Sequence, residues 1–206
     1  MKVLMINGSP NKNGCTGAAL SIVADELAAN GVDSEIIWLG KGPIRGCAAC
    51  GGCRDCRCVF DGDPVNEAAE KLSGADALIV GSPVYYASAT GTVTAFLDRL
   101  FQVAGSRLVN KPGAAVVSCR RGGASATFDQ LNKYFTITCM PLVTSNYWNM
   151  VHGSKAEDVY GDPEGVQTMK VLARNMAWLL KCIEAGRKAG VEPPAEEEKI
   201  YFNYVR

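Results

Sequence analysis

The stretch Lys2-Val-Leu-Met-Ile-Asn-Gly-Ser-Pro-Asn-Lys-Asn-Gly-Cys-Thr-Gly17 decides the fold of this chain. Residues 2–7 are almost continuously apolar, which is typical of a central strand covered on both faces. The polar, glycine-rich segment after them leads into a helix that we predict over residues 16–29, with Asn30-Gly31 at its end. A central strand joined to a helix by such a loop predicts an α/β domain whose site lies at the carboxyl end of the strand.

Apolar runs and helical patterns alternate along the rest of the chain. We predict further strands at residues 32–39, 77–81, 114–118 and 142–145. We predict further helices at residues 64–72, 92–101, 126–135 and 163–189. The last helix has an apolar stripe made of Val166, Met169, Leu172, Ala173, Met176, Leu179, Leu180 and Ile183. Because right-handed crossovers place a helix between neighbouring parallel strands, the pattern predicts a flavodoxin-like three-layer sandwich with a five-stranded parallel sheet of order 2-1-3-4-5.

The length and the charge of the chain limit its possible domain organisation and its possible partners. The 206 residues suit one globular domain, so we predict a single domain over residues 1–206 with an irregular loop at 40–63. Lys and Arg number 21 and so do Asp and Glu, which leaves no overall field to attract nucleic acid or an anionic membrane. The first residues are too short an apolar run for a signal peptide, and no later run approaches a membrane span. We therefore expect a soluble, cytoplasmic protein.

The tail at residues 190–206 differs in composition from the rest. It carries two adjacent prolines and three consecutive glutamates, and it then becomes aromatic at Tyr201, Phe202 and Tyr204. Such a segment seldom folds alone. We expect either a docked extension that covers apolar surface or a contact between subunits.

The loop over residues 8–17 has the composition of a phosphate site. It joins a central strand to a helix start, where unpaired backbone N–H groups and the positive end of the helix dipole meet. Ser9 and Thr16 add hydroxyl donors, and glycines let the backbone approach an oxyanion. A mostly neutral loop suits a monophosphate held by many hydrogen bonds. A simple capped helix is the alternative, but the length of the polar run exceeds what capping requires.

Missing residues exclude several other phosphate chemistries. The chain has neither the GxxxxGK[ST] sequence of a triphosphate loop nor a GxGxxG sequence after the first strand. A phosphatase of similar topology needs a Cys-x5-Arg loop, but the sixth residue after Cys15 is Ser21. A phosphoacceptor domain needs an Asp at the end of the third strand, where this chain has Gly81-Ser82-Pro83.

Further motifs extend over nearly the whole chain. They are Asn7-Gly-Ser-Pro10 with Gly14 and Thr16, a cysteine cluster at 47–58, Gly81-Ser-Pro-Val-Tyr-Tyr86, Phe96-Leu-Asp-Arg99, Arg121-Gly-Gly123 and Tyr147-Trp-Asn149. Together they resemble the NADPH-dependent FMN reductase family and, within it, the iron-sulfur flavoproteins. The resemblance implies an FMN with its phosphate on the first loop and its ring against residues 83–88 and 118–123. The cofactor-binding residues implied are Ser9, Asn11, Gly14, Cys15, Thr16, Gly17, Pro83, Val84, Tyr85, Tyr86, Ser88, Ser118, Arg120, Arg121, Gly122 and Gly123.

The residues of the ring-binding loops suit those roles on physical grounds. Pro83 fixes a turn at a strand end, and the backbone of residues 84–86 can hydrogen-bond a flat heterocycle while aromatic surface packs beside it. Arg120 and Arg121 either lie near the pyrimidine edge of the flavin, where positive charge favours the reduced anion, or form a solvated pair at a helix start.

The remaining candidates flank these loops. Tyr147 and Trp148 are expected to follow the fifth strand and to shape the substrate face. His152 is the sole histidine, and we expect it on a solvated loop without a catalytic role. We expect no catalytic residue of the protein itself, because the flavin N5 atom accepts the hydride while the protein supplies position and electrostatics.

Nine cysteines are present, and five of them fall between residues 47 and 58. In a reducing cytoplasm, crowded thiols favour metal binding or redox chemistry over stable disulfides. The spacing Cys47-x2-Cys50-x2-Cys53-x4-Cys58 resembles that of the iron-sulfur flavoproteins, which implies a [4Fe-4S] cluster on these four thiolates, with Cys56 as an extra thiol. Zinc or an empty loop are the alternatives, although zinc sites normally use two CxxC pairs separated by an intervening stretch.

Three functions are compatible with these features. The first is an enzyme in which NAD(P)H reduces FMN and the flavin passes electrons to a quinone, another flavin or a similar small acceptor, directly or through the cluster. The second is an electron-transfer module with a ferredoxin-like partner, which the balanced charge weakly disfavours. The third is a flavin-binding redox sensor without enzymatic activity. Flavin sites shared between subunits favour a homodimer or homotetramer.

Overall fold

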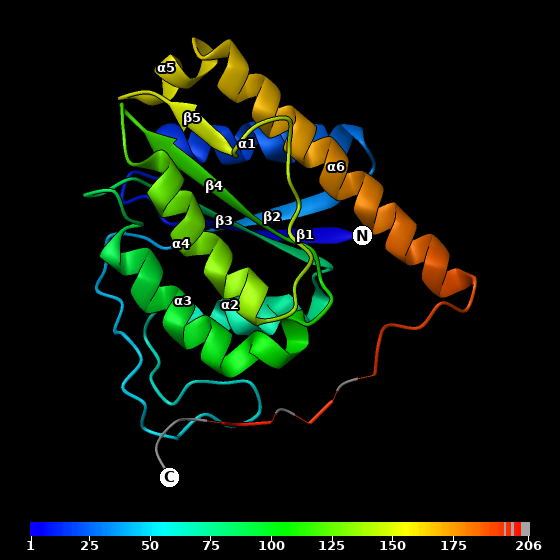
Figure 1. The fold of residues 1–206 in the computed structure, drawn as a ribbon. Helices are drawn as coiled ribbons and strands as arrows, with labels where there is room; N and C mark the ends of the chain where they lie inside the picture. The colour runs from blue at the N-terminus through cyan, green and yellow to red at the C-terminus, as the bar shows by residue number, and fades with distance from the viewer. Residues whose placement is uncertain (196, 199, 203–206) are drawn as a thin grey trace.

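One parallel sheet organises the part of the chain that the structure describes. The computed structural model describes residues 1–195, 197–198 and 200–202. Within them the strands are β1 (Lys2–Asn7), β2 (Asp33–Trp38), β3 (Ala77–Pro83), β4 (Gly113–Cys119) and β5 (Met150–His152). Their order is β2-β1-β3-β4-β5 and every pairing is parallel (Figure 1). The predicted sheet order and the central position of the first strand are confirmed.

Helices cover both faces of the sheet. On one face lie α1 (Cys15–Ala29), α5 (Ala156–Tyr160) and α6 (Pro163–Lys188). On the other lie α2 (Val65–Lys71), α3 (Gly91–Ala104) and α4 (Ala124–Ile137), with short 3-10 turns at Leu72–Gly74 and Gly105–Leu108. Figure 1 shows these two layers above and below the strands. The structure is therefore the predicted three-layer α/β sandwich.

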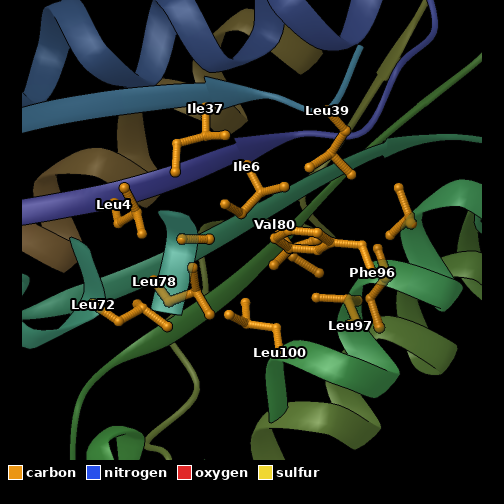
Figure 2. Packing of buried hydrophobic residues seen from close by; sticks show 14 of the residues in the cluster. Leu4, Ile6, Ile37, Leu39, Leu72, Leu78, Val80, Phe96, Leu97 and Leu100 are labelled. Atoms are coloured by element: carbon orange, nitrogen blue, oxygen red, sulfur yellow. The ribbon is translucent and has the colours of Figure 1, made fainter. Parts of the chain in front are cut away.

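The core on the α2 and α3 side shows how alternate strand residues divide between the layers. Leu4 and Ile6 of β1 point to this side, whereas Val3 and Met5 point towards α1 and α6. In Figure 2, the leucine and isoleucine meet side chains of β3 and α3, among them Phe96. All of these side chains are fully buried, and burying one large apolar side chain contributes roughly 1.5–3 kcal/mol. This packing fixes α3 against the sheet.

The fifth strand is not where the sequence predicts it, and the interval 142–145 is wrong. Leu142 makes a single parallel bridge to Gly113, and the chain then leaves the sheet. It returns at Met150, which pairs with Val117 of β4. The apolar run before the excursion is only two residues long and polar residues follow it, so it cannot extend the ladder. His152 consequently lies at the end of β5 and not on a loop, although its side chain is exposed as expected.

The other predicted elements occur with shifted ends. The helix predicted at 92–101 runs from Gly91 to Ala104, and the strand predicted at 77–81 continues to Pro83. The short helix α5 was not predicted. No helix of the described residues combines the length and the apolar character needed to span a bilayer.

The apolar side chains near the end of the described tail are exposed. The side chains of Ile200, Tyr201 and Phe202 are 91%, 86% and 80% exposed. Tyr204 lies outside the described residues. Both expectations for this segment, a docked extension and a contact between subunits, stay predictions.

Candidate flavin and cysteine sites

The side chain of Asn7, the last residue of β1, organises the loop that leads to α1. Its Oδ1 accepts a hydrogen bond of 3.1 Å from the Ser9 backbone N–H, and its Nδ2 donates one of 2.9 Å to the Lys12 carbonyl oxygen. The Ser9 hydroxyl in turn accepts a bond of 3.1 Å from the Asn11 backbone N–H. The loop is therefore held from inside by its own polar groups.

The first turn of α1 differs from those of α3 and α6, and it shares the absence of a side-chain cap with α4. Gly14 precedes it in an extended conformation, and no side chain of the described residues caps it. By contrast, the Thr90 hydroxyl caps α3 and the Asp162 carboxylate caps α6. A Cβ atom at Gly17 would lie 2.2 Å from the Lys12 carbonyl oxygen, so loop and helix touch there. The leading N–H groups and the helix dipole are thus available to an anion.

Hydrogen bonds join the loops after β1, β3 and β4 at the carboxyl edge of the sheet. The hydroxyl oxygens of Thr16 and Ser118 are 2.8 Å apart and both residues are buried. The Val84 backbone N–H donates to the Ser118 carbonyl oxygen at 2.9 Å. The Gly8 N–H likewise donates to the Gly81 carbonyl oxygen at 2.9 Å. The structure therefore brings together the three segments that the sequence predicts for the flavin.

A tight turn displays Tyr86 at the tip of the loop after β3. Tyr85 and Ser88 exchange backbone hydrogen bonds of 2.9 and 3.0 Å, and Tyr86 and Ala87 between them have φ angles of 52° and 58°. Two positive φ angles define a type I′ turn, which non-glycine residues adopt at a cost. The Gln130 Oε1 of α4 accepts from the Ser88 hydroxyl at 2.9 Å and fixes the turn. The Tyr86 side chain is fully exposed.

Gly123 connects the loop after β4 to this turn. Its φ is 88°, and a Cβ atom there would lie 2.8 Å from the Ala87 Cα. Only glycine therefore allows the two loops to approach this closely. Arg120, Arg121 and Gly122 before it are exposed, so the two arginines remain compatible with both roles considered for them.

Among the predicted cofactor residues, Cys15 has its thiol directed away from the loops. The Cys15 Sγ donates to the Lys155 carbonyl oxygen at 3.3 Å. Burial, followed by the nearby Asp158 carboxylate, raises the pKa of this thiol. Its backbone N–H remains in the first turn of α1. We therefore assign it a backbone role in the candidate site.

Tyr147 and Trp148 precede β5 instead of following the fifth strand. Their ring centroids are 5.1 Å apart, and each side chain is about half exposed. They line a surface cavity of about 530 Å³ with Phe128 of α4. Asn149 at its base is buried, and its Nδ2 lacks a hydrogen-bond partner among the described residues.

The predicted cluster ligands line one cavity beside α3. This cavity has a volume of about 360 Å³, and Cys47, Cys50, Cys53 and Cys58 all contribute to its wall. Cys56, the extra thiol, does not. Burial, followed by repulsion from Cys58, Cys50 and Cys47, raises the pKa of Cys53. Within the described residues, no three side chains of His, Cys, Asp or Glu are close enough together to hold a metal ion as they stand.

Arg99 of α3 contacts the cysteine-rich loop, residues 40–63, at four points. Its guanidinium donates to the Cys58 Sγ at 3.3 Å, the Arg45 carbonyl oxygen at 3.3 Å, and the Phe60 carbonyl oxygen at 2.6 Å. It also pairs with the Asp63 carboxylate. Burial opposes its charge, but the bonds to Cys58 and Asp63 outweigh this and raise the pKa of Arg99. It is therefore a buried, permanent cation.

The sequence also indicates this structural role of Arg99, although the motif Phe96-Leu-Asp-Arg99 supports only the family resemblance. Arg99 follows Phe96 by three positions and directly precedes Leu100, so it borders the apolar face of α3. An arginine at such a position needs buried partners.

Asn66 of α2 is a second residue that the sequence did not identify. Its Oδ1 accepts from the Cys58 backbone N–H at 2.8 Å, and its Nδ2 donates to the Cys58 carbonyl oxygen at 3.0 Å. Asn66 therefore holds the backbone of Cys58, whereas Arg99 contacts its sulfur.

The sheet order and the loops gathered at its carboxyl edge define a protein of the flavodoxin-like class. An archaeal flavodoxin superposes with a TM-score of 0.59 at 18% identity, covering 88% of this chain and 99% of that one. The chain belongs to the NADPH-dependent FMN reductase family, whose model matches residues 1–155. It is accordingly a flavin-dependent oxidoreductase by family.

Two curated relatives are similar over most of the chain. An iron-sulfur flavoprotein of Methanocaldococcus jannaschii is 30% identical, covering 89% of this chain and 100% of the relative. An iron-sulfur flavoprotein of Methanosarcina thermophila is 32% identical, covering 91% of this chain and 99% of the relative. These matches confirm the resemblance stated from the motifs.

Proposed function

We propose that this protein binds FMN, takes a hydride from NAD(P)H, and passes the electrons to a flavin, a quinone or a similar small acceptor. The observation that carries the proposal is the uncapped start of α1 within a ring of loops tied together by Thr16 and Ser118. The backbone N–H groups there suit a terminal phosphate, since they offer several donors. Lys12 is the one basic residue of this loop, and its Nζ lies 5.9 Å from the centroid of the Trp38 ring. FMN supplies the atom that accepts the hydride.

The residues around the ring site have separate tasks. The backbone N–H groups of Val84 and Tyr85 are paired with the Ser118 and Ser88 carbonyl oxygens, and Gln130 fixes the same loop, so its rigid shape favours a constant orientation of the ring. Arg120 and Arg121 are exposed near the same edge, where positive charge would stabilise a reduced, anionic flavin.

We further propose that Cys47, Cys50, Cys53 and Cys58 hold a [4Fe-4S] cluster. Four thiols on one cavity wall are the donor set that such a cluster requires. The names of the two relatives favour the same group. Cys47 and Cys50 are exposed, so the loop carrying them has room to close around the cluster.

Anaerobic mixing tests the enzymatic proposal. FMN-loaded protein is mixed with NADPH or NADH, and the visible absorption of the flavin is followed. We expect bleaching with at least one nicotinamide, and recovery of the absorption when menadione or free FMN is added. Flavin that stays oxidised with both nicotinamides would contradict the proposal.

An electron-transfer module is the second candidate, because the cysteine cavity and the relatives' names both favour an iron-sulfur group. The same apparatus separates the two. Rapid bleaching by reduced ferredoxin, with none by either nicotinamide, would favour the module.

Iron analysis tests the cluster. Protein purified without oxygen is assayed for iron and sulfide, and its electron paramagnetic resonance (EPR) spectrum is recorded after reduction by dithionite. We expect Cys58→Ser to lose most of the iron and Cys56→Ser, the matched control two residues earlier in the chain, to keep it. Equal iron in both variants, or none in the parent protein, would contradict the assignment.

A further inference from the structure

We propose that Arg99 and Asp63 form a buried charge pair that sets the reduction potential of the cluster on the cysteine-rich loop. This inference rests on the proposed cluster and concerns residues to which the sequence motifs assign no role. Arg99 is a positioning residue for Cys58 and an electrostatic one for the group that Cys58 would ligate.

Burial makes the pair electrostatically significant. The Arg99 side chain is 1% exposed and that of Asp63 is 8% exposed. Charges buried in this way are screened much less by water and salt than surface charges. A buried ion pair is in itself weak support for stability, because desolvation offsets much of the attraction. A role in the neighbouring site accounts better for its presence.

The contact with Cys58 connects the Arg99–Asp63 pair to the proposed cluster site. The Arg99 Nε–H donates to the Cys58 Sγ at 3.3 Å, and both atoms belong to side chains that border the same cavity. Cys58 is the most buried of the four predicted ligands, at 6% exposed. The potentials of iron-sulfur groups depend on hydrogen bonds to sulfur, on nearby net charge and on burial. All three conditions meet at this sulfur.

The sign of each effect follows from charge. Addition of one electron would increase the negative charge on the proposed cluster and its cysteine ligands, next to Arg99. The Arg99 cation stabilises that extra charge, so it raises the reduction potential. The Asp63 carboxylate offsets part of the cation's field, so it lowers the potential. Arg45 packs over the Phe60 ring at 4.1 Å, but Arg45 is exposed and its field is screened by solvent.

Substitutions at the two residues should therefore shift the potential in opposite directions. Arg99→Met removes the cation and the sulfur contact, and we expect a lower midpoint potential. Asp63→Asn keeps the Oδ1 acceptor for the Val65 N–H but removes the negative charge, and we expect a higher one. Arg99→Lys keeps a cation without the guanidinium fork, so we expect a smaller fall than with methionine.

EPR-monitored redox titration of the anaerobically purified protein measures these shifts. Arg45→Met is the matched control, because it removes a cation from the same loop at an exposed position, where solvent screens its field. We expect its potential to stay at the parent value even if its iron content falls. This readout separates electrostatic tuning from a merely structural role, which would lower iron content in every variant and shift no potential systematically.

Several outcomes would overturn the inference. Shifts of the same sign in Arg99→Met and Asp63→Asn, or no shift in either, would show that the pair does not tune the site. If Arg99→Met fails to fold, Asp63→Asn alone decides, and an unchanged potential rejects the proposal. A parent protein without iron overturns the proposed cluster and this inference together, whereas iron with unshifted potentials overturns only the latter.

Discussion

The hydroxyl groups of Thr16 on α1 and Ser118 on β4 share a hydrogen bond of 2.8 Å across 102 positions of sequence. Both residues are buried, so the bond is shielded from water. It joins the N-terminal end of α1 to the carboxyl end of β4, which lies two strands away from β1 in the sheet. The loop over residues 8–17 and the loop after β4 are thereby coupled.

Ser118→Ala should weaken this coupling. The loss of one buried hydrogen bond costs about 1 kcal/mol of stability. We expect urea denaturation of the FMN-free protein to show that loss, and FMN titration to show a roughly fivefold weaker affinity, which corresponds to about 1 kcal/mol. Ser21→Ala, an exposed position on α1, is the control and should change neither. Unchanged FMN affinity in Ser118→Ala would show that the two loops act independently.

Gly17→Ala should disturb the loop over residues 8–17, the proposed phosphate site, more than the fold. Its Cβ would stand 2.2 Å from the Lys12 carbonyl oxygen, so the loop must move away from the first turn of α1. We expect FMN affinity to fall by about tenfold or more, measured by fluorescence titration. Gly74→Ala is the control, because a Cβ there meets nothing within 4 Å. Normal FMN binding by Gly17→Ala would place the phosphate elsewhere.

The sheet was predictable because its pattern is local. The run at residues 2–7 is almost fully apolar, and the strand it forms is buried on both faces. Strand order followed from the alternation of strands with helices. The predicted position of the fifth strand was wrong because two apolar runs compete for it. Leu142-Val143 is no longer than Met150-Val151, and only the pairing with β4 distinguishes them.

Long-range partners in the sites were harder to predict. Cysteine spacing indicated which thiols share a cavity, since the residues lie within one loop. The approach of Arg99 to Cys58 across 41 positions depends on how α3 packs, which no local pattern reports. Gln130, 42 positions from Ser88, was missed for the same reason, whereas Asn66, eight positions from Cys58, was missed because no motif marks it.

Ala87→Gly should stabilise the protein. Ala87 has a φ of 58°, and the left-handed conformation costs a residue with a Cβ roughly 1–2 kcal/mol. Glycine removes that cost but adds freedom to the unfolded chain, so we expect a net gain of about 0.5–1 kcal/mol. Ala185→Gly, near the end of α6, is the matched control and should lose about 0.5 kcal/mol. Urea denaturation measures both, and a destabilised Ala87→Gly would show that the strain at this turn is relieved in another way.

Asp162→Asn should reduce the pH dependence of stability in acid. Burial opposes the charge of Asp162, but hydrogen bonds from the Gly165 and His152 backbone N–H groups outweigh it and lower the pKa of the carboxyl. A lowered pKa in the folded state means that the carboxylate stabilises the fold above its unfolded pKa of about 3.9, and that this stabilisation is lost as pH falls through the lower, folded value. We expect Asp162→Asn to lose about 1 kcal/mol at about pH 7 and to approach the parent protein near pH 2. Urea denaturation across this range measures the difference, with the exposed Asp25→Asn as control. A gap that stays constant with pH would show that the cap contributes through its shape and not through its charge.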